Sequence, residues 1–388
     1  MKNKLFKISL VLLTFITFLS SCNVYKIINN EEVLKTNKEQ PFELEGNKMY
    51  VNVIIENGVE EKLIFDTGAT KNMLFDTLLI PNYSSKQKVN FGKTKLPDGS
   101  AVKNSLVAVN MKSQMFDFKS YATGVVQHSS SNCRENSKKG LIGSYPLPIL
   151  FNGGLLQFDF DEQKIVFLEK SELETRKLMG FKEVKTKFIK SNSHFLVYLT
   201  INGVEEPFLF DTGNSSFPII VSSKSEIKSE LPFSEYDGAL LSLANGKHND
   251  ANNLIKLNSS FKIADETYET GYLKTSTFEG DYNNIGTAFI KNFNWIVDYD
   301  LQKVYFKRNS IQLSSPTISS FEFDYKVFAD PTNELRIITK RKGLSTFQLN
   351  DKILSVNGVL IDKENICEYE QLLNKNKKWD NFEIKTKK

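Results

Sequence analysis

The sequence predicts a mainly β protein with two homologous lobes, followed by a small α+β domain. The first and second halves of the chain repeat one another, and within each repeat apolar residues alternate with polar ones at the period of two that a β-strand imposes. The last part of the chain lacks this repeat and combines short strand patterns with one helical pattern. A chain of 388 residues has room for two or three domains.

The N-terminus has the pattern of a secretion signal. The basic start Met1–Lys4 precedes a mostly apolar run, Leu5–Leu19, which is shorter than the roughly 20 residues that a membrane-spanning helix needs. Two serines and Cys22 follow, and small residues before a cysteine resemble a bacterial lipobox. We therefore expect residues 1–22 to be a lipoprotein signal peptide. The lipid on Cys22 would hold the protein at a membrane of the bacterial cell envelope, on the periplasmic or outer-membrane side. An ordinary secretion signal with an incidental Cys22 is the alternative.

The repeat begins with a β-hairpin in each half. The string Asn-Gly-Val-Glu-Glu starts at Asn57 and again at Asn202, and in both copies an Asp-Thr-Gly triplet follows at the same offset. Each copy predicts an apolar strand, an Asn-Gly turn and a second strand that returns to the aspartate. Asp66 and Asp211 are therefore expected where a strand ends.

The correspondence continues to the end of each half. Ile-Gly pairs at Gly143 and Gly286 follow the two aspartates at nearly equal distances. After each pair comes a short helical segment and then two strands joined by an acidic turn. Two homologous β-rich lobes, 45–168 and 190–308, are expected.

Further turn signals lie midway between each aspartate and its Ile-Gly pair, at Gly99 and Gly246. They predict either mobile flap hairpins over a cleft or ordinary surface hairpins.

The segment 315–388 has a different pattern of predicted elements from the two repeats. It predicts a strand, a Gly-Leu turn at Gly343, a hairpin with an Asn-Gly turn at Gly358 and a helix over Glu364–Leu373. This order resembles the PDZ domains of bacterial proteases, although the loop that binds peptide ends in such domains is not identifiable here.

Charge and metal-binding residue types limit the classes of function. The formal net charge is +4, from 50 basic and 46 acidic residues, and lysines are spread along the chain, so we expect no nucleic-acid partner. Three histidines and three cysteines occur in no CxxC or HExxH arrangement, so we expect no metal site. Cys133 and Cys367 lie in different predicted domains with no spacing that implies a bridge, so we expect two structural thiols.

Two Asp-Thr-Gly turns suit one kind of chemistry. Peptide-bond hydrolysis without a metal or covalent nucleophile needs a base that polarises water and an acid that protonates the carbonyl oxygen. Two adjacent carboxyls that share one proton supply both, because like charges about 3 Å apart do not both ionise easily. Asp66 and Asp211 are the candidate pair, and this chemistry requires no cofactor. Threonine can hydrogen-bond across to the other lobe, and glycine lets the backbone approach the carboxyls.

Together these motifs resemble the retropepsin-like aspartic peptidases. The resemblance rests on Phe65–Thr70, Ile142-Gly143, Phe210–Ser215 and Ile285-Gly286. It implies two pepsin-like β-barrel lobes, a peptide or protein substrate in the cleft between them, and an active site complete in one chain. The site residues that it implies are the catalytic Asp66 and Asp211, the cross-lobe Thr67 and Thr212, the turn glycines Gly68 and Gly213, and Gly143 and Gly286 beneath the turns.

The wider architecture is similar to bacterial aspartyl protease family proteins with a C-terminal PDZ domain, which implies an envelope-anchored aspartic endopeptidase. One residue departs from the family pattern: Asn214 stands where Ala, Ser or Thr is usual. We expect this change to alter the hydrogen bonding around Asp211.

Three alternatives remain. A catalytically inactive lipoprotein could keep the cleft and bind peptides without cutting them. A structural envelope lipoprotein could use the PDZ-like tail to recruit partners. Serine chemistry has little support, because Ser144 lacks the GxSxG elbow and His128, His194 and His248 are isolated.

Overall fold

The computed structural model is mainly β and describes most of the chain after its N-terminal segment. The described residues are 30–56, 58–95, 101–125, 133, 139–215, 217–222, 224–227, 234–238, 241–242, 248–249, 252–255, 259–270, 273–276, 282–311, 323–330 and 332–387. The predicted signal peptide with Cys22, both candidate flap tips and His128 lie outside them. Within the described ranges no helix is long and apolar enough to cross a membrane.

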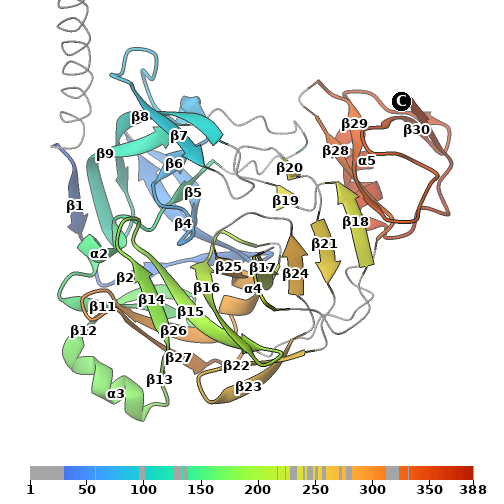
Figure 1. Ribbon diagram of the computed structural model, residues 1–388. Helices are drawn as coiled ribbons and strands as arrows, with labels where there is room; N and C mark the ends of the chain where they lie inside the picture. Colours follow the sequence, from blue (N-terminus) through green and yellow to red (C-terminus); the bar gives the residue numbers. More distant parts are fainter. Residues whose placement is uncertain are drawn as a thin grey trace, which may run out of the picture.

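The first repeat folds into a sheet that closes on itself, which we name the first unit (Figure 1). In its described part, β9 pairs with β6, β6 with β10, β10 with β5, β5 with β4, β4 with β8, and β8 again with β9. A ring of pairings makes the unit barrel-like and leaves its apolar side chains inside. The strands are β1 Glu32–Lys35, β3 Glu43–Glu45, β4 Lys48–Ile55, β5 Val59–Phe65, β6 Met73–Leu74, β7 Val89–Lys95, β8 Ala101–Lys112, β9 Phe116–Val125 and β10 Gly140–Ile142, with the short helix η1 Thr77–Leu79.

The second repeat, the second unit, has the same pattern of pairing. The parallel pair β5–β10 corresponds to β16–β25, β6–β10 to β17–β25, and β6–β9 to β17–β24. The repeat seen in the sequence is therefore also a repeat of strand topology. The strands are β14 Thr186–Ile189, β15 His194–Ile201, β16 Val204–Asp211, β17 Ile219–Val221, β18 Ser234–Gly238, β19 Leu241–Ser242, β20 His248–Asn249, β21 Asn252–Ile255, β22 Ser259–Ile263, β23 Glu266–Thr270, β24 Leu273–Ser276 and β25 Asn283–Gly286.

The predicted Asn-Gly turns differ between the two units. In the second unit Asn202 and Gly203 form a two-residue loop with φ of 51° and 79°, as a type I′ hairpin turn requires. In the first unit the loop between Ile55 and Val59 is one residue longer, and Glu56 also has a positive φ. Both hairpins nevertheless return the chain to an aspartate.

A third sheet joins the two units. Its strand order is β13-β27-β26-β11-β12-β2, and the central contact pairs β11 of the first half with β26 of the second. The predicted short helices α2 and α4 follow Gly143 and Gly286 and lead into these strands. The elements are β2 Glu39–Pro41, α2 Leu147–Leu150, β11 Gly154–Asp159, β12 Lys164–Glu169, η2 Lys170–Glu172, α3 Leu173–Leu178, β13 Lys182–Val184, α4 Thr287–Ile290, β26 Phe293–Asp298 and β27 Lys303–Arg308.

A chain of aromatic rings connects the joining sheet to the two aspartates. Phe65 and Phe210, the residues before them, are buried, and both rings contact Phe158 of β11, with centroids 6.0 and 5.7 Å away. Phe210 also packs edge-on against Trp295 of β26 at 5.1 Å. Side chains of this size exclude water and fix the strand ends, so the positions of both aspartates follow from one shared core.

The C-terminal unit has its own apolar core, which includes Tyr325, Leu335, Ile353, Leu373 and Trp379. The predicted helix is two residues later than expected, and the Asn-Gly hairpin forms between β30 and β31. The elements are β28 Tyr325–Ala329, β29 Leu335–Arg341, β30 Lys352–Val356, β31 Val359–Leu360, α5 Ile366–Lys375 and β32 Ile384–Lys387.

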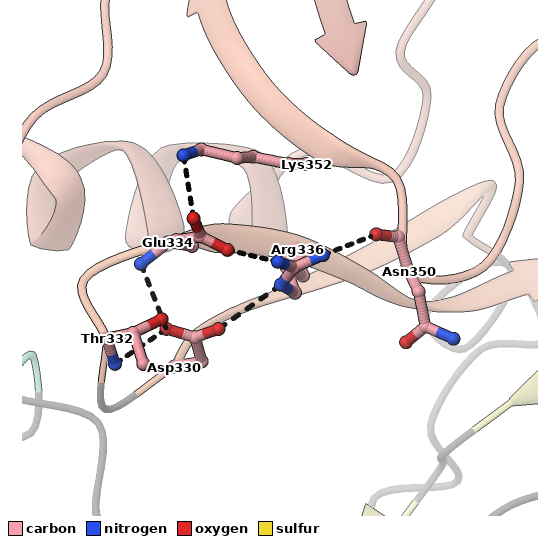
Figure 2. Close-up of polar contacts among 6 residues, drawn as sticks. All are labelled: Asp330, Thr332, Glu334, Arg336, Asn350 and Lys352. Atoms are coloured by element: carbon pink, nitrogen blue, oxygen red, sulfur yellow. Dashed lines mark hydrogen bonds and ion pairs between the residues drawn. The ribbon is translucent and has the colours of Figure 1, made fainter. Parts of the chain in front are cut away.

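A polar network holds the turn between β28 and β29 (Figure 2). Asp330 accepts the backbone N–H groups of Thr332 and Glu334 at 2.8 and 3.0 Å. The Arg336 guanidinium joins Asp330 to Glu334 and to the backbone carbonyl of Asn350, 3.0 Å away. The Lys352 ammonium of β30 also donates to Glu334 at 2.8 Å, so the network ties the turn to β30.

The C-terminal unit is not detached from the second unit. β29 pairs with β18 (Figure 1). The Lys342 N–H donates to the carbonyl of Glu235 at 2.8 Å, and the buried Tyr236 ring stacks on Phe323. Gly238 has a φ of 90°, and a side chain there would overlap the carbonyl of Ile338. The small sheet is therefore continuous with the sheet of the second unit through the pair β18–β29.

The expectation of two separate thiols was wrong. Cys133, in the segment between β9 and β10, forms a disulfide with Cys367 of α5, with the Cα atoms 4.6 Å apart. The sequence separation of 234 hid this contact, because only tertiary packing brings Cys367 of α5 beside Cys133.

Candidate active site

The two Asp-Thr-Gly turns begin where two equivalent strands end. β5 ends at Phe65, directly before Asp66, and β16 ends at Asp211 itself. Each aspartate is held against the neighbouring parallel strand: the Asp66 N–H donates to the carbonyl of Ile142 at 2.9 Å, and Asp211 is in register with Gly286. The tertiary fold brings the turns face to face.

The threonines of the two turns exchange hydrogen bonds. The Thr67 hydroxyl donates to the carbonyl of Phe210 at 2.7 Å, and the Thr212 hydroxyl donates to the carbonyl of Phe65 at 2.6 Å. Each hydroxyl oxygen also accepts the backbone N–H of the other threonine, at 3.0 and 3.1 Å. Both side chains are buried, at 2% and 0% exposure. Four reciprocal hydrogen bonds therefore join the turns with nearly two-fold symmetry.

Each turn glycine faces the opposite carboxyl group. A Cβ atom on Gly68 would overlap the carboxyl of Asp211, and one on Gly213 would overlap that of Asp66. The two carboxyls thus lie within the paired turns, each against the backbone of the other one. Only glycine leaves room for this approach.

Backbone N–H groups hold one oxygen of each carboxyl. Asp66 Oδ1 accepts from Gly68 and Ala69 at 3.0 and 2.9 Å. Asp211 Oδ1 accepts from Gly213 and Asn214 at 2.9 and 3.1 Å. Because the donors belong to rigid turns, the orientation of both carboxyls is set before any ligand binds.

The glycines of the two Ile-Gly pairs lie beneath the turns. A side chain on Gly143 would overlap the backbone of Lys71, and one on Gly286 would overlap the carbonyls of Asn214 and Phe217. All eight predicted site residues of the two repeats are thus in one place. Their catalytic role stays a prediction.

Sequence reasoning missed Asn284. Its side-chain Nδ2 donates to Asp211 Oδ2 at 2.5 Å, and its Oδ1 accepts from Asn214 Nδ2 at 2.8 Å. The predicted change of hydrogen bonding near Asp211 thus runs through a second asparagine. An alignment of the two repeats could have pointed to this residue, because a polar Asn284 stands where the first unit has the apolar Leu141.

His194 is not isolated, contrary to the expectation. It lies at the start of β15, is buried, hydrogen-bonds with the backbone of Ala69 and is close enough to Asp211 to interact with its charge. Burial lowers the pKa of the His194 imidazole below its ordinary 6.5, while Asp211 and the Ala69 backbone act in the opposite direction. A neutral imidazole therefore stands beside the first turn at neutral pH.

Ser144 has a structural environment. Its buried hydroxyl oxygen lies 3.0 Å from the carbonyl of Ala69 and 2.9 Å from that of Asn192. A hydroxyl whose proton is directed to carbonyl groups has no base to activate it, so the serine alternative gains nothing from the structure.

A cavity of about 370 Å³ lies beside the site and not at it. Tyr145, Ile149, Phe188 and Tyr299 are among the residues that line it, and neither candidate aspartate does. Within the described ranges, no group of three or more His, Cys, Asp or Glu residues could hold a metal ion.

No protein-family model matches this chain, and a search of curated proteins finds no relative.

The threonine exchange predicts a stability change. Thr67→Val keeps the side-chain shape but leaves the Phe210 carbonyl and the Thr212 N–H without their partner, so the free energy of unfolding should fall by about 2 to 4 kcal/mol. Urea denaturation measures this change. Thr123→Val is the control, because Thr123 is equally buried but donates one weak hydrogen bond, 3.2 Å long, to Tyr121. Equal losses in the two variants would contradict the prediction.

His194 predicts a pH dependence of stability. Because its pKa is lowered in the folded protein, the unfolded chain takes up this proton at higher pH than the folded chain does. The contribution of the neutral His194 to the free energy of unfolding is fully present above pH 6.5 and is lost as the pH falls toward the pKa of the folded state. The free energy of unfolding of His194→Gln, measured in urea from about pH 8 to pH 5, should fall less with acid than that of the wild type. Parallel curves would disprove this role of burial.

Proposed function

We propose that the chain is an aspartic endopeptidase whose catalytic pair is Asp66 and Asp211. The observation that carries the proposal is the reciprocal packing of the two Asp-Thr-Gly turns, with each glycine against the opposite carboxyl. A turn that only ended a strand would need no partner of the same sequence. The packing instead concentrates two acids in one place, which favours a pair that shares one proton.

The shared proton gives the pair two functions at once. The ionised carboxyl removes a proton from a water molecule while the water oxygen attacks the carbonyl carbon of the peptide bond. The protonated carboxyl supplies a proton to the carbonyl oxygen. The backbone N–H groups of both turns keep the carboxyls oriented during this exchange, so little reorganisation is needed in the transition state.

The two units are proposed to be the lobes of a retropepsin-like fold. The equivalent pairing in the two ring-like sheets and the sheet that joins them support this assignment. A peptide would lie as an extended strand between the lobes, next to the turns. One chain supplies both turns, so the proposed site is complete without a second copy.

The C-terminal unit is proposed to be PDZ-like, with a changed role. PDZ domains bind a peptide by adding it to a strand edge. Here the backbone N–H and C=O of Val327 in β28 bond to the Asn374 side chain at 3.0 and 2.9 Å, and the Ala329 N–H donates to Glu370 at 3.1 Å. A peptide would have to displace both side chains of α5. The strand that pairs with this sheet is instead the chain's own β18.

The loss of either aspartate is the direct test of the catalytic pair. Asp66→Asn and Asp211→Asn should each lower kcat/KM for a cleaved library peptide by about 100-fold or more, because each variant removes one partner of the proton exchange. Cleavage is measured by mass spectrometry over acidic to neutral pH.

The control for this test is Asp117→Asn on β9, away from the turns. It should keep wild-type cleavage. A folded wild type that cuts no peptide at any pH, yet binds peptides, would favour the inactive peptide-binding lipoprotein.

Attachment to the bacterial envelope through Cys22 is also proposed. The Cys133–Cys367 disulfide supports a location outside the reducing cytoplasm. Cys22→Ala should move the protein from the membrane fraction to the soluble fraction of the envelope, as measured by immunoblotting, with Cys367→Ala as the cysteine control. Membrane association of Cys22→Ala would count against a lipid anchor.

A further inference from the structure

The cavity beside the candidate active site lies between the two halves of the chain. Helix α2 of the first half supplies Ile149 to its wall. Strand β14 of the second half supplies Phe188, and the turn between β26 and β27 supplies Tyr299 and Gln302. The volume of about 370 Å³ is within the range of pockets that hold small ligands. A ligand in this cavity would contact both halves.

The cavity falls where the two repeats differ in length. Asp159 and Asp298 are equivalent, because each ends a strand and pairs with a lysine across the same kind of hairpin. Asp159 comes 16 residues after Gly143, whereas Asp298 comes 12 residues after Gly286. The first half therefore has four extra residues in the segment that contains α2.

The residue after each of these aspartates has a different environment. Phe160 is 1% exposed, and its ring packs edge-on against Phe42 with the centroids 5.3 Å apart. The equivalent Tyr299 is only partly buried, and it borders the cavity. An aromatic position that is filled in one half is thus open to a ligand in the other.

The wall of the cavity is mostly apolar and carries one cation. Lys190 is the only residue of a charged type among the lining residues, and in the described contacts it forms no ion pair. Ser193 and Gln302 add uncharged hydrogen-bonding groups. Tyr145 and Ile149 are 45% and 55% exposed, so apolar surface stays in contact with water until a ligand covers it.

We propose that this cavity binds a small amphipathic anion, namely a carboxylate with an apolar chain. The chain would cover Ile149, Phe188 and Tyr299, and the carboxylate would lie at the Lys190 ammonium. A cationic ligand would find no acidic partner among the lining residues. Neither Asp66 nor Asp211 lines the cavity, so this inference does not depend on the proposed peptidase function.

Isothermal titration calorimetry with octanoate tests the proposal. The protein is the chain from Asn23 onward, which contains every described residue and lacks the predicted anchor. Octanoate should bind at one site. Octanol should bind about 3-fold more weakly, because it lacks the charge, and acetate should not bind measurably, because it lacks the chain.

Lys190→Met tests the cation, since it keeps most of the apolar stem and removes the charge. It should weaken the binding of octanoate by about 3-fold and leave that of octanol unchanged. Lys187→Met is the matched control. Lys187 belongs to β14 but does not line the cavity, and its ammonium lies 5.7 Å from the centroid of the Tyr282 ring.

Ile149→Asp tests the apolar wall. The side chain is already 55% exposed, so the variant should fold, and a like charge at the cavity should weaken octanoate binding by about 5-fold or more. Leu178→Asp is the matched control, because Leu178 is 90% exposed at the end of α3 and does not line the cavity. Saturating octanoate should also raise the Tm of the wild type and of both controls more than that of Ile149→Asp.

The outcomes separate this inference from the proposed function. The absence of saturable binding, together with an unchanged Tm, would overturn the inference. Octanoate binding that Lys190→Met and Ile149→Asp leave unchanged would also overturn it, because the ligand would then lie elsewhere. Equal affinities for octanol and octanoate would reject the anion. Octanoate binding that responds to both variants, in a chain that cuts no peptide, would uphold the inference and reject only the peptidase.

Discussion

The structure depends on two buried turns, each of which completes the other. The carbonyls of Phe65 and Phe210 end two buried strands, and each receives its hydrogen bond from the threonine of the opposite turn. A buried carbonyl without a partner costs about 1 to 3 kcal/mol, so neither turn is stable in this form alone. Because these hydrogen bonds join the two turns, the carboxyls of Asp66 and Asp211 come to lie close together. The chain thus tolerates a close pair of acids because hydrogen bonds surround them.

The surrounding fold supplies the rigidity that this exchange needs. Phe65 and Phe210 both pack on Phe158, so the shared sheet and the two strand ends form one core. Close packing transmits any shift of β11 or β26 to the turns. The C-terminal unit is connected to the rest of the chain in two ways. β29 pairs with β18 of the second unit, and Cys367 forms the disulfide with Cys133.

Repetition and divergence have separate roles in the site. The repeated elements, namely both turns, the threonines and the glycines, build a symmetric cradle in which the two acids are equivalent. The proposed hydrolysis by a shared proton would require the two acids to differ at each moment. In the described contacts the Asn284 side chain donates to Asp211, and its counterpart in the first unit is Leu141, whose side chain has no donor.

The sequence by itself determined the mainly β class, the repeat, the strand ends at Asp66 and Asp211 and the glycines around them, because hydrophobic period, turn residues and repeated strings are local signals. It did not reveal the Cys133–Cys367 disulfide, the docking of β29 on β18, or the contacts of His194 and Asn284 with the site. Each of these joins residues far apart in the chain that share no local pattern. Their contacts depend on how the units pack, and only the tertiary structure decides that.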